Sequence, residues 1–385
     1  MKKSLLALAV LAVATSATAA TVYDKDGTSL KVGGRVQAVA FNGNFGKAGR
    51  DDASLKNSAR FNVAGTTKVN DAVSVFAFTE WEASNGNNEK GADNDFTARD
   101  QYVGADFGVF GKVQAGKSLN AIYDVQSATD VFEEVGSAQV QGDTNGDRRS
   151  GTFRYIYDNN GLYASASFQT AQDQVKVAGN KLDVENGFGF GLGYTFDNVV
   201  FGPLSVKAAY DYVKCQDDSD FIQTDEDGKK ILPAGRAFDS FKNTAVSVAW
   251  GSDSGLYFAA LFTVSKVTFD NYTDGIYKTN PRAKVKGAEL VAGYGFDNGL
   301  SLTIGYHFKD EKEKYTGWTS SSSIQRRVPV IAYYQVAPTF KVWVEAEFDA
   351  NSSDNANFRG TILGREYDEH NAKDTLVAAG ARYVF

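Results

Sequence analysis

Val377-Ala-Ala-Gly380-Ala-Arg-Tyr383-Val-Phe385, the stretch that ends the chain, carries an apolar residue at every second position. Alternate residues of a β-strand share one face, so Val377, Tyr383 and Phe385 are expected on the same apolar face. Terminal residues of soluble domains are usually polar and poorly ordered. An apolar face that continues to the last residue is typical of the closing strand of a transmembrane β-barrel, and we interpret the stretch in that way.

The same period of two recurs in segments that have one apolar and one polar face. Between Leu300 and Phe308, five apolar residues alternate with serine, threonine, glycine and histidine. Between Phe340 and Phe348, five alternate with lysine, tryptophan and glutamate. No amphipathic helix produces this spacing. These segments are therefore predicted to be strands with one face toward lipid and one toward a polar interior.

Sixteen such segments can be placed along the chain, and an even count is usual for a single-chain bacterial barrel. We predict strands at 28–42, 55–68, 72–85, 96–107, 110–117, 148–158, 161–172, 186–196, 203–214, 239–251, 255–268, 284–296, 299–311, 326–337, 338–350 and 374–385. Tight turns such as Asp297-Asn298-Gly299 alternate with long polar connections. The sequence thus predicts an all-β, antiparallel, up-and-down transmembrane barrel of 16 strands with short periplasmic turns and long outer loops.

The first residues have the three parts of an export signal. Met1-Lys2-Lys3 is basic, residues 5–13 are apolar, and Ala17-Thr-Ala19 is a small-residue cleavage site. We expect a signal peptide at 1–19 and a barrel domain at 20–385. Cleavage would remove two lysines and so make the formal net charge of −7 more negative by two. No basic footprint for nucleic acid remains, and no apolar run of about 18 residues predicts a spanning helix.

The connection 118–147, which we call loop three, is the longest in the chain and is strongly acidic. It contains no lysine or arginine. Its acids are Asp124, Asp130, Glu133, Glu134, Asp143 and Asp147. A barrel of about sixteen strands encloses water rather than side chains. We expect loop three to fold into the lumen and narrow it.

Loop three and several other motifs resemble those of a known family, the general diffusion porins of Gram-negative outer membranes. The resemblance is strongest to the trimeric enterobacterial type of outer membrane protein C and F. The resemblance covers the whole mature chain. Its motifs are Val22-Tyr23-Asp-Lys25-Asp26-Gly27, Gly34-Arg35, Tyr123-Asp124-Val125, Thr129-Asp130-Val131-Phe-Glu-Glu134-Val-Gly136 and the terminal Tyr383-Val-Phe385. It implies a Gram-negative outer-membrane location.

The resemblance also implies a pore constriction between loop acids and bases of the opposite wall. Asp130 and Glu134 match the family's two acidic loop positions. The matching basic positions on strands one, two, four and six are Arg35, Arg60, Arg99 and Arg148, with Arg35 standing where the familiar members have lysine. Loop three also departs from the family, because Glu133-Glu134-Val135-Gly136-Ser137 replaces the usual Pro-Glu-Phe-Gly-Gly.

Strand parity is an independent argument for these lumen assignments. Arg35, Arg60 and Arg148 are each out of phase with the apolar residues of their own strands, so they are expected to face the lumen. Asp100 shares the phase of Tyr102, which we take as lipid-facing, and is therefore expected near the headgroups, at a subunit contact or in a bulge. Glu80 and Glu82 share the lumen parity of strand three, where they fit either the charge network or ordinary lumen polarity.

The resemblance implies a water-filled channel for passive passage of small hydrophilic solutes and ions, with no catalytic role. The acids of loop three and the negative net charge predict weak cation selectivity. The partners implied are two further copies in a homotrimer, outer-membrane lipid and lipopolysaccharide, and the barrel assembly machinery. Gly380, Tyr383 and Phe385 resemble the assembly signal. Small lipid-parity residues of 32–40 and 377–381 suggest the subunit interface.

Other functional classes have weaker support. A substrate-specific channel for sugars, nucleosides or organic anions would need an aromatic track along the lumen, for which Trp343 and Tyr257 are candidates. An enzyme would need a partnered nucleophile, and His307 is the one histidine on a predicted strand. Cys215 is the single cysteine, so no disulfide framework or thiolate metal site is expected, and no cofactor is predicted. A purely structural barrel or adhesin would lack an open channel.

Overall fold

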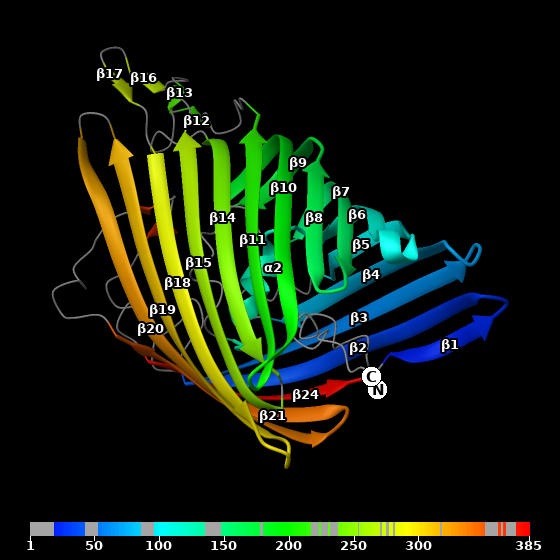
Figure 1. The fold of residues 1–385 in the computed structure, drawn as a ribbon. Helices are drawn as coiled ribbons and strands as arrows, with labels where there is room; N and C mark the ends of the chain where they lie inside the picture. Colours follow the sequence, from blue (N-terminus) through cyan, green and yellow to red (C-terminus); the bar gives the residue numbers. More distant parts are fainter. Residues whose placement is uncertain are drawn as a thin grey trace.

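The wall of the protein is one antiparallel sheet that closes on itself, as the computed structural model shows (Figure 1). The structure describes residues 19–42, 53–85, 96–134, 148–177, 180–216, 223–224, 230–231, 238–252, 254–269, 272–274, 277–279, 282–315, 318–350, 361–362, 365–366 and 375–385. The predicted signal peptide 1–19 lies outside these residues except for Ala19 and stays a prediction. Asp143 and Asp147 of loop three also lie outside them.

Sixteen strands form the barrel wall, which confirms the predicted fold class and strand number. They are β2 (Thr28–Phe41), β3 (Ser54–Lys68), β4 (Ser74–Asn85), β5 (Thr97–Asp106), β6 (Lys112–Leu119), β7 (Arg148–Asn159), β8 (Leu162–Gln169), β10 (Asn180–Val199), β11 (Gly202–Cys215), β14 (Phe238–Gly251), β15 (Gly255–Phe269), β18 (Arg282–Gly295), β19 (Leu300–Tyr315), β20 (Trp318–Ala337), β21 (Phe340–Asp349) and β24 (Leu376–Val384). Each coincides with one predicted segment. β20 begins earlier than predicted because its polar first residues pair with the end of β19, as Ser322 does with Lys312.

Shorter elements lie at the ends of the wall or inside it. β1 (Ala20–Lys25) and β9 (Gln172–Val177) extend the sheet at β2 and β10. The hairpins β12/β13 (Gln223–Thr224, Lys230–Ile231), β16/β17 (Tyr272–Asp274, Tyr277–Thr279) and β22/β23 (Thr361–Ile362, Arg365–Glu366) are separate two-stranded sheets. The helical turns are η1 (Gly108–Phe110), α2 (Tyr123–Gln126) and η2 (Ser127–Thr129). Within the described residues, no helix is both long and apolar enough to cross a membrane.

The barrel closes where both ends of the described chain meet β2. Phe385 exchanges two backbone hydrogen bonds with Gly34, at N···O distances of 2.8 and 3.0 Å, and Ala20 pairs with Val32 two residues away. β24 therefore covers one half of β2 and β1 covers the other half, end to end (Figure 1). Together they act as one strand of the closed wall.

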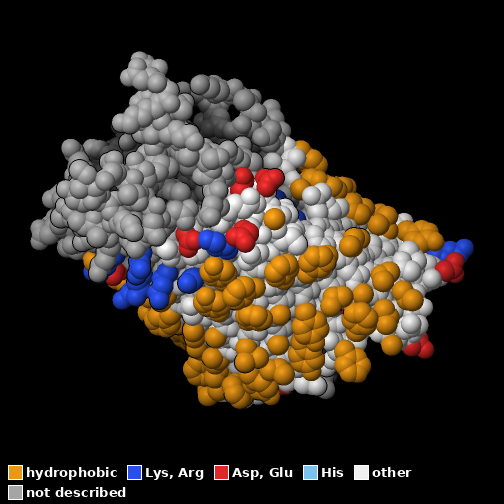
Figure 2. Space-filling view, turned by 90° about the horizontal axis from the view of Figure 1, so that it is seen from above, with side chains coloured by type: hydrophobic (Ala, Val, Ile, Leu, Met, Phe, Trp, Pro, Cys, Tyr) orange, Lys and Arg blue, Asp and Glu red, His pale blue; other side chains and the backbone are white. Residues whose placement is uncertain are grey.

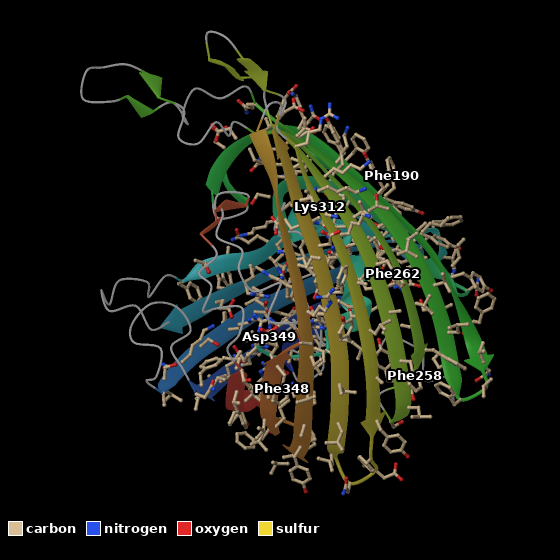
Figure 3. All side chains as sticks on the ribbon, turned by 90° about the vertical axis from the view of Figure 1, so that its left-hand side faces the viewer. Phe190, Phe258, Phe262, Lys312, Phe348 and Asp349 are labelled. Carbon is tan, nitrogen blue, oxygen red and sulfur yellow. The ribbon has the colours of Figure 1, made fainter. Side chains whose placement is uncertain are left out.

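Side chains alternate between an apolar outer surface and a polar interior. The outer surface is covered by exposed apolar side chains (Figures 2 and 3), among them Val36, Phe61, Val103, Phe153, Phe190, Phe262, Leu290 and Ile304. Charged residues such as Glu345 and Arg382 are buried on the lumen side. This inversion of the soluble pattern is what lipid on the outside and water on the inside require.

The described part of loop three lies inside the barrel, with α2 visible behind the wall strands (Figure 1). Ile122 and Val125 pack on Ala209, Ala245 and Leu261, which project from β11, β14 and β15. A second apolar cluster surrounds the following loop residues. It contains Val131 and Phe132 of the loop with Val39, Phe41, Tyr257, Ala259, Val291, Ile331, Trp343 and Ala378 of the wall. Loop three is thus seated on the lumen wall by buried apolar contacts, as the predicted inward fold requires.

Candidate functional site

The first part of loop three is held by a half-buried carboxylate, that of Asp124. Asp124 of α2 accepts hydrogen bonds from the Arg154 guanidinium of β7 and the Tyr163 hydroxyl of β8. Arg154 also donates to the carbonyl of Leu119 at 2.7 Å. Charge-assisted bonds of this kind are the stronger ones, so they fix the point at which the loop leaves the wall.

The middle of loop three is held through its backbone. The Tyr257 hydroxyl donates to the carbonyl of Ala128, and the Tyr333 hydroxyl donates to the carbonyl of Val131 at 2.6 Å. Thr129 donates its hydroxyl to the buried carboxyl group of Glu289. The sequence makes Tyr257 a candidate for an aromatic solute track, but its ring is buried beneath the loop. Tyr257 therefore holds loop three in place and does not line a path for solutes.

Glu133 is the strongest anchor of the loop tip. Its carboxylate accepts hydrogen bonds from Arg382 of β24 and Lys341 of β21. Burial alone would raise the pKa of this carboxyl, but the charges of Arg382 and Lys341 and their hydrogen bonds outweigh burial and lower the pKa to about 2. Among the six acids of loop three, Glu133 is thus one that holds the loop to the wall.

The neighbouring Glu134 is in a different environment. The backbone N–H groups of Glu133 and Glu134 donate to the two carboxylate oxygens of Glu345, at 3.2 and 3.0 Å. Within the described residues, the Glu134 side chain accepts one hydrogen bond, from the amide of Gln37 at 3.3 Å. Burial raises the pKa of Glu134 above its ordinary value, although Lys56 attracts the ionised form. Within the described residues, the Glu134 carboxyl thus accepts no hydrogen bond from a guanidinium group.

Three of the predicted constriction arginines form ion pairs with acids of the barrel wall. Arg60 lies 3.0 Å from Glu82, and Arg99 lies 2.9 Å from Glu80 and 2.7 Å from Glu82. Arg148 lies 2.8 Å from Asp100. The resemblance implies that the acids of loop three face these arginines and compensate their charge. The structure supplies this compensation from the strands, so Glu80 and Glu82 belong to the charge network.

Arg35 is arranged differently from the other predicted arginines. It lies directly opposite Arg60 in the register of β2 and β3, and Arg382 lies opposite its neighbour Gln37. Its Nε atom is buried and donates no hydrogen bond within the described residues. Arg35 therefore adds positive charge to a region that already contains two arginines. The second loop acid, Asp130, accepts a hydrogen bond of 2.6 Å from the Tyr123 hydroxyl.

The position of Asp100 follows from a β-bulge, one of the three places expected for it. The pairing of β4 with β5 shifts by one residue at Arg99, between the pairs Glu80–Asp100 and Trp81–Ala98. Asp100 is buried on the lumen side. The assignment of Tyr102 to the lipid face was wrong, because Tyr102 lies opposite Phe78 on the same face as Asp100 and Glu80. A bulge places two consecutive side chains on the same side of the sheet. The face of a residue beyond the bulge therefore cannot be assigned from the alternation of the residues before it.

Parity also missed some of the lumen charges. Arg149 has the phase of the lipid-facing Phe153, yet it is buried and bonded to Asp211 at 2.7 Å. The shift comes from an irregular pairing near Gly151, whose φ of +66° favours glycine. The position of Arg382 on the lumen face can be predicted from the sequence, since it is out of phase with the lipid-facing Tyr383 of the same strand.

Two other candidates of the sequence analysis lie beneath loop three. Trp343 is buried against Gly380, where any Cβ would approach the indole ring to 2.1 Å. His307 contacts the ring of Phe132 edge-on, with centroids 5.7 Å apart. Both side chains thus support the loop.

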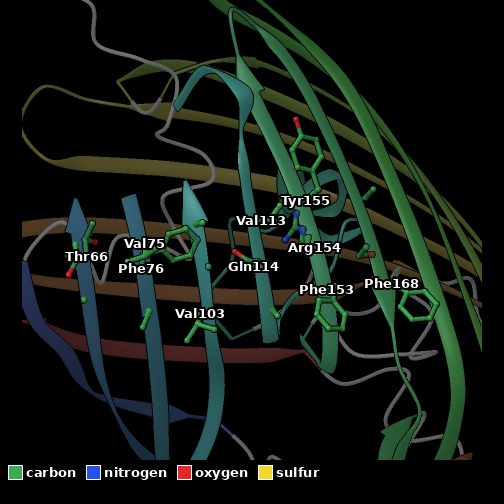
Figure 4. Close-up of a pocket in the computed structure, with 18 of the residues that line it drawn as sticks. Thr66, Val75, Phe76, Val103, Val113, Gln114, Phe153, Arg154, Tyr155 and Phe168 are labelled. Atoms are coloured by element: carbon green, nitrogen blue, oxygen red, sulfur yellow. The ribbon is translucent and has the colours of Figure 1, made fainter. Parts of the chain in front are cut away.

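The outer wall has a concave apolar surface over β2 to β10 (Figure 4). Both small side chains and aromatic rings line it. The lining includes Gly65, Ala77, Val103, Ala115, Phe153 and Phe168. The small residues predicted to form a subunit interface are also on the outer face, where Val36 is 54% exposed.

Comparison with known proteins adds to this geometry. A family model described as Gram-negative porin matches residues 6–356. The outer membrane porin PhoE of Enterobacter cloacae is 26% identical over all of both chains, and the outer membrane porin protein OmpD of Citrobacter koseri is 29% identical over all of both. A structure of Salmonella typhi OmpF in complex with daunomycin superposes with a TM-score of 0.72 at 21% identity, covering 95% of this chain and 100% of that one.

Proposed function

The chain belongs to the family of Gram-negative porins, and from that premise we propose that its channel weakly favours cations. The protein is an outer-membrane general diffusion porin, a water-filled channel for passive passage of small hydrophilic solutes and ions. Its family and fold are those of channel proteins.

The observation that carries the selectivity proposal is the pairing of the wall arginines. Arg60, Arg99 and Arg148 are each bound to carboxylates of the wall, so much of their charge is compensated before an ion arrives. The tip of loop three adds the carboxyls of Asp130 and Glu134. Fixed charges of one sign in a narrow water-filled path raise the local concentration of the opposite ion.

Arg35 works against this preference. It is the predicted pore arginine whose Nε has no hydrogen-bond partner within the described residues, and its charge repels cations from the β2 wall. We therefore propose that Asp130 and Glu134 on one side and Arg35 on the other set the residual field. Arg60, Arg99 and Arg148 are proposed to hold the wall network that shapes the opening. Because the charge of Arg35 opposes those of Asp130 and Glu134, the preference for cations is expected to be weak.

Reversal potentials across a planar bilayer with a salt gradient test the proposal. The wild type should favour the cation, and the preference should decrease in Asp130→Asn/Glu134→Gln, because two acids are removed without touching the ion pairs of the wall. Channel openings in the variant serve as the control for folding. A wild-type preference for chloride would refute the selectivity, and an unchanged preference in the variant would refute the assignment to these residues.

For assembly, we propose a homotrimer whose interface includes the outer faces of β2 and β24. The small residues there allow close approach of a flat wall. We also propose that Gly380, Tyr383 and Phe385 are read by the barrel assembly machinery, and that lipopolysaccharide is the lipid partner. Phe385 and Gly380 have packing roles as well. The Phe385 ring lies over Gly34, and Trp343 lies over Gly380.

A substrate-specific channel remains the second candidate, because one observation favours it. Phe76, Phe78 and Tyr102 share the lumen face near the short-turn end, with the rings of Phe78 and Tyr102 5.5 Å apart. Such rings can stack on a solute. Saturable block of the conductance by one class of solute would support this candidate over a general pore.

A further inference from the structure

Four lysines line up across four neighbouring strands of the outer wall. Lys242 of β14 pairs with Lys266 of β15, Lys266 pairs with Lys284 of β18, and Lys284 pairs with Lys312 of β19. All four side chains are exposed on the lipid side. We call these four residues the lysine row.

The lysine row holds like charges at close spacing. Directly paired residues of adjacent strands have Cβ atoms about 5 Å apart, and like charges in this position destabilise a sheet. Within the described residues, the lysine row has one ion pair, between Lys312 and Asp310 at 3.2 Å. Two further exposed bases of β18, Arg282 and Lys286, lie beside Lys284. The arrangement is therefore a concentration of positive charge that an external anion would stabilise.

The lysine row stands at a border of the apolar surface. β14 begins at Phe238, so Lys242 is near the end of the wall that carries the long loops, which faces the cell exterior in outer-membrane barrels. Toward the other end, the same strands expose Phe262 and Leu290. Figure 3 shows Lys312, Phe262 and Phe258 following one another along this wall, and Figure 2 shows basic side chains gathered at a border of the apolar surface.

We propose that the lysine row binds the phosphate groups of an anionic glycolipid of the outer leaflet, whose acyl chains lie along the apolar strands below it. The proposal rests on the lipopolysaccharide partnership put forward above and gives it a location. A lipid fits better than a free anion, because the charge and the apolar surface adjoin on the same four strands. Strands β20 and β21 lie between the row and β24, so a trimer formed through β2 and β24 would leave the row open to lipid.

The test uses the full-length protein, purified in detergent, with native mass spectrometry to count bound lipid. The probes are bis-phosphorylated lipid A and lipid A with both phosphates removed. The variant Lys266→Gln/Lys284→Gln removes the two central charges of the row. The control Lys68→Gln/Lys112→Gln removes the same charge from exposed lysines at the short-turn end. Single-channel conductance of each variant checks that the pore is intact.

Wild type and control should bind phosphorylated lipid A equally, and the row variant should bind it about 30-fold more weakly, since each lysine near an anionic lipid surface contributes roughly fivefold. Removing the phosphates should cause a similar loss in the wild type. Equal binding by the row variant would overturn the location while leaving the lipid partnership in place. No binding by the wild type would overturn both. Displacement of the lipid by millimolar inorganic phosphate would show a free-anion site and overturn the lipid as occupant.

Discussion

Gly34 and Phe385 face each other across the seam at which the barrel closes. They exchange two backbone hydrogen bonds, and the Phe385 ring covers the Cα of Gly34 so closely that a Cβ there would lie 2.7 Å from the ring and 2.4 Å from the carbonyl oxygen of Arg60. The terminal aromatic residue and the glycine of the first wall strand are thus one packing unit.

Gly34→Ala should therefore lower the stability of the folded barrel, by about 1–3 kcal/mol, because overpacking forces the wall or the ring to shift. Gly65→Ala is the matched control, since a Cβ at Gly65 meets only Leu30, at an ordinary distance of 3.9 Å. Unfolding in urea followed by heat-modifiable gel mobility measures both. Equal stability of the two variants would contradict the packing argument.

Glu133→Gln should loosen the tip of loop three. The substitution leaves Arg382 and Lys341 without their carboxylate in a buried setting, and removing one partner of such a pair costs about 3–5 kcal/mol. We expect lower resistance to denaturant and more frequent partial closures in single-channel records. Glu134→Gln is the control, because within the described residues the Glu134 side chain accepts only the 3.3 Å hydrogen bond from Gln37. Quiet channels in Glu133→Gln would show that other anchors suffice.

Acidification should change selectivity before it releases the loop. The pKa of Glu134 is raised, so this carboxyl becomes neutral at a higher pH than an ordinary glutamate and stops attracting cations. The pKa of Glu133 is lowered to about 2 from 4.5. Its contribution to stability is fully present above pH 4.5 and is lost only as the pH falls through about 2.

The measurement for this prediction is the reversal potential between pH 7 and pH 4, together with the unfolding midpoint over the same range. Cation preference should decline while the Glu133 anchor is still intact. In Glu134→Gln, cation preference should decline less between pH 7 and pH 4 than in the wild type, because the contribution of the Glu134 carboxyl is absent. A decline of the same size in that variant would assign the titration to other carboxyls.

Arg35→Gln should strengthen cation preference with little effect on stability. The Nε of Arg35 has no hydrogen-bond partner within the described residues, and Arg35 is repelled by Arg382 and by Arg60, which lies opposite it in the sheet, so its removal relieves repulsion. Arg60→Gln removes the same charge but also the ion pair with Glu82, and it should be the less stable of the two. Reversal potentials and urea unfolding compare them. A loss of cation preference in Arg35→Gln would contradict the proposed field.

The fold could be predicted from the sequence because a barrel wall is a local pattern. Lipid on one face and water on the other impose a period of two on each strand, and this period is visible in the residues themselves. The prediction failed where the backbone departs from that period. The bulge at Arg99 turned Asp100 and Tyr102 to the lumen, and the irregular pairing near Gly151 did the same for Arg149.

By itself, the sequence determined the wall, its strand number and the acidity of loop three, since alternation and composition are properties of neighbouring residues. Only the tertiary structure decided which charges meet. Glu133 and Arg382 are 249 positions apart, and no local pattern distinguishes a loop acid that anchors from one that faces the pore. Closure of the barrel brings β21 and β24 beneath the loop tip, and that closure assigns Glu133 to its two bases and leaves Glu134 beside Gln37.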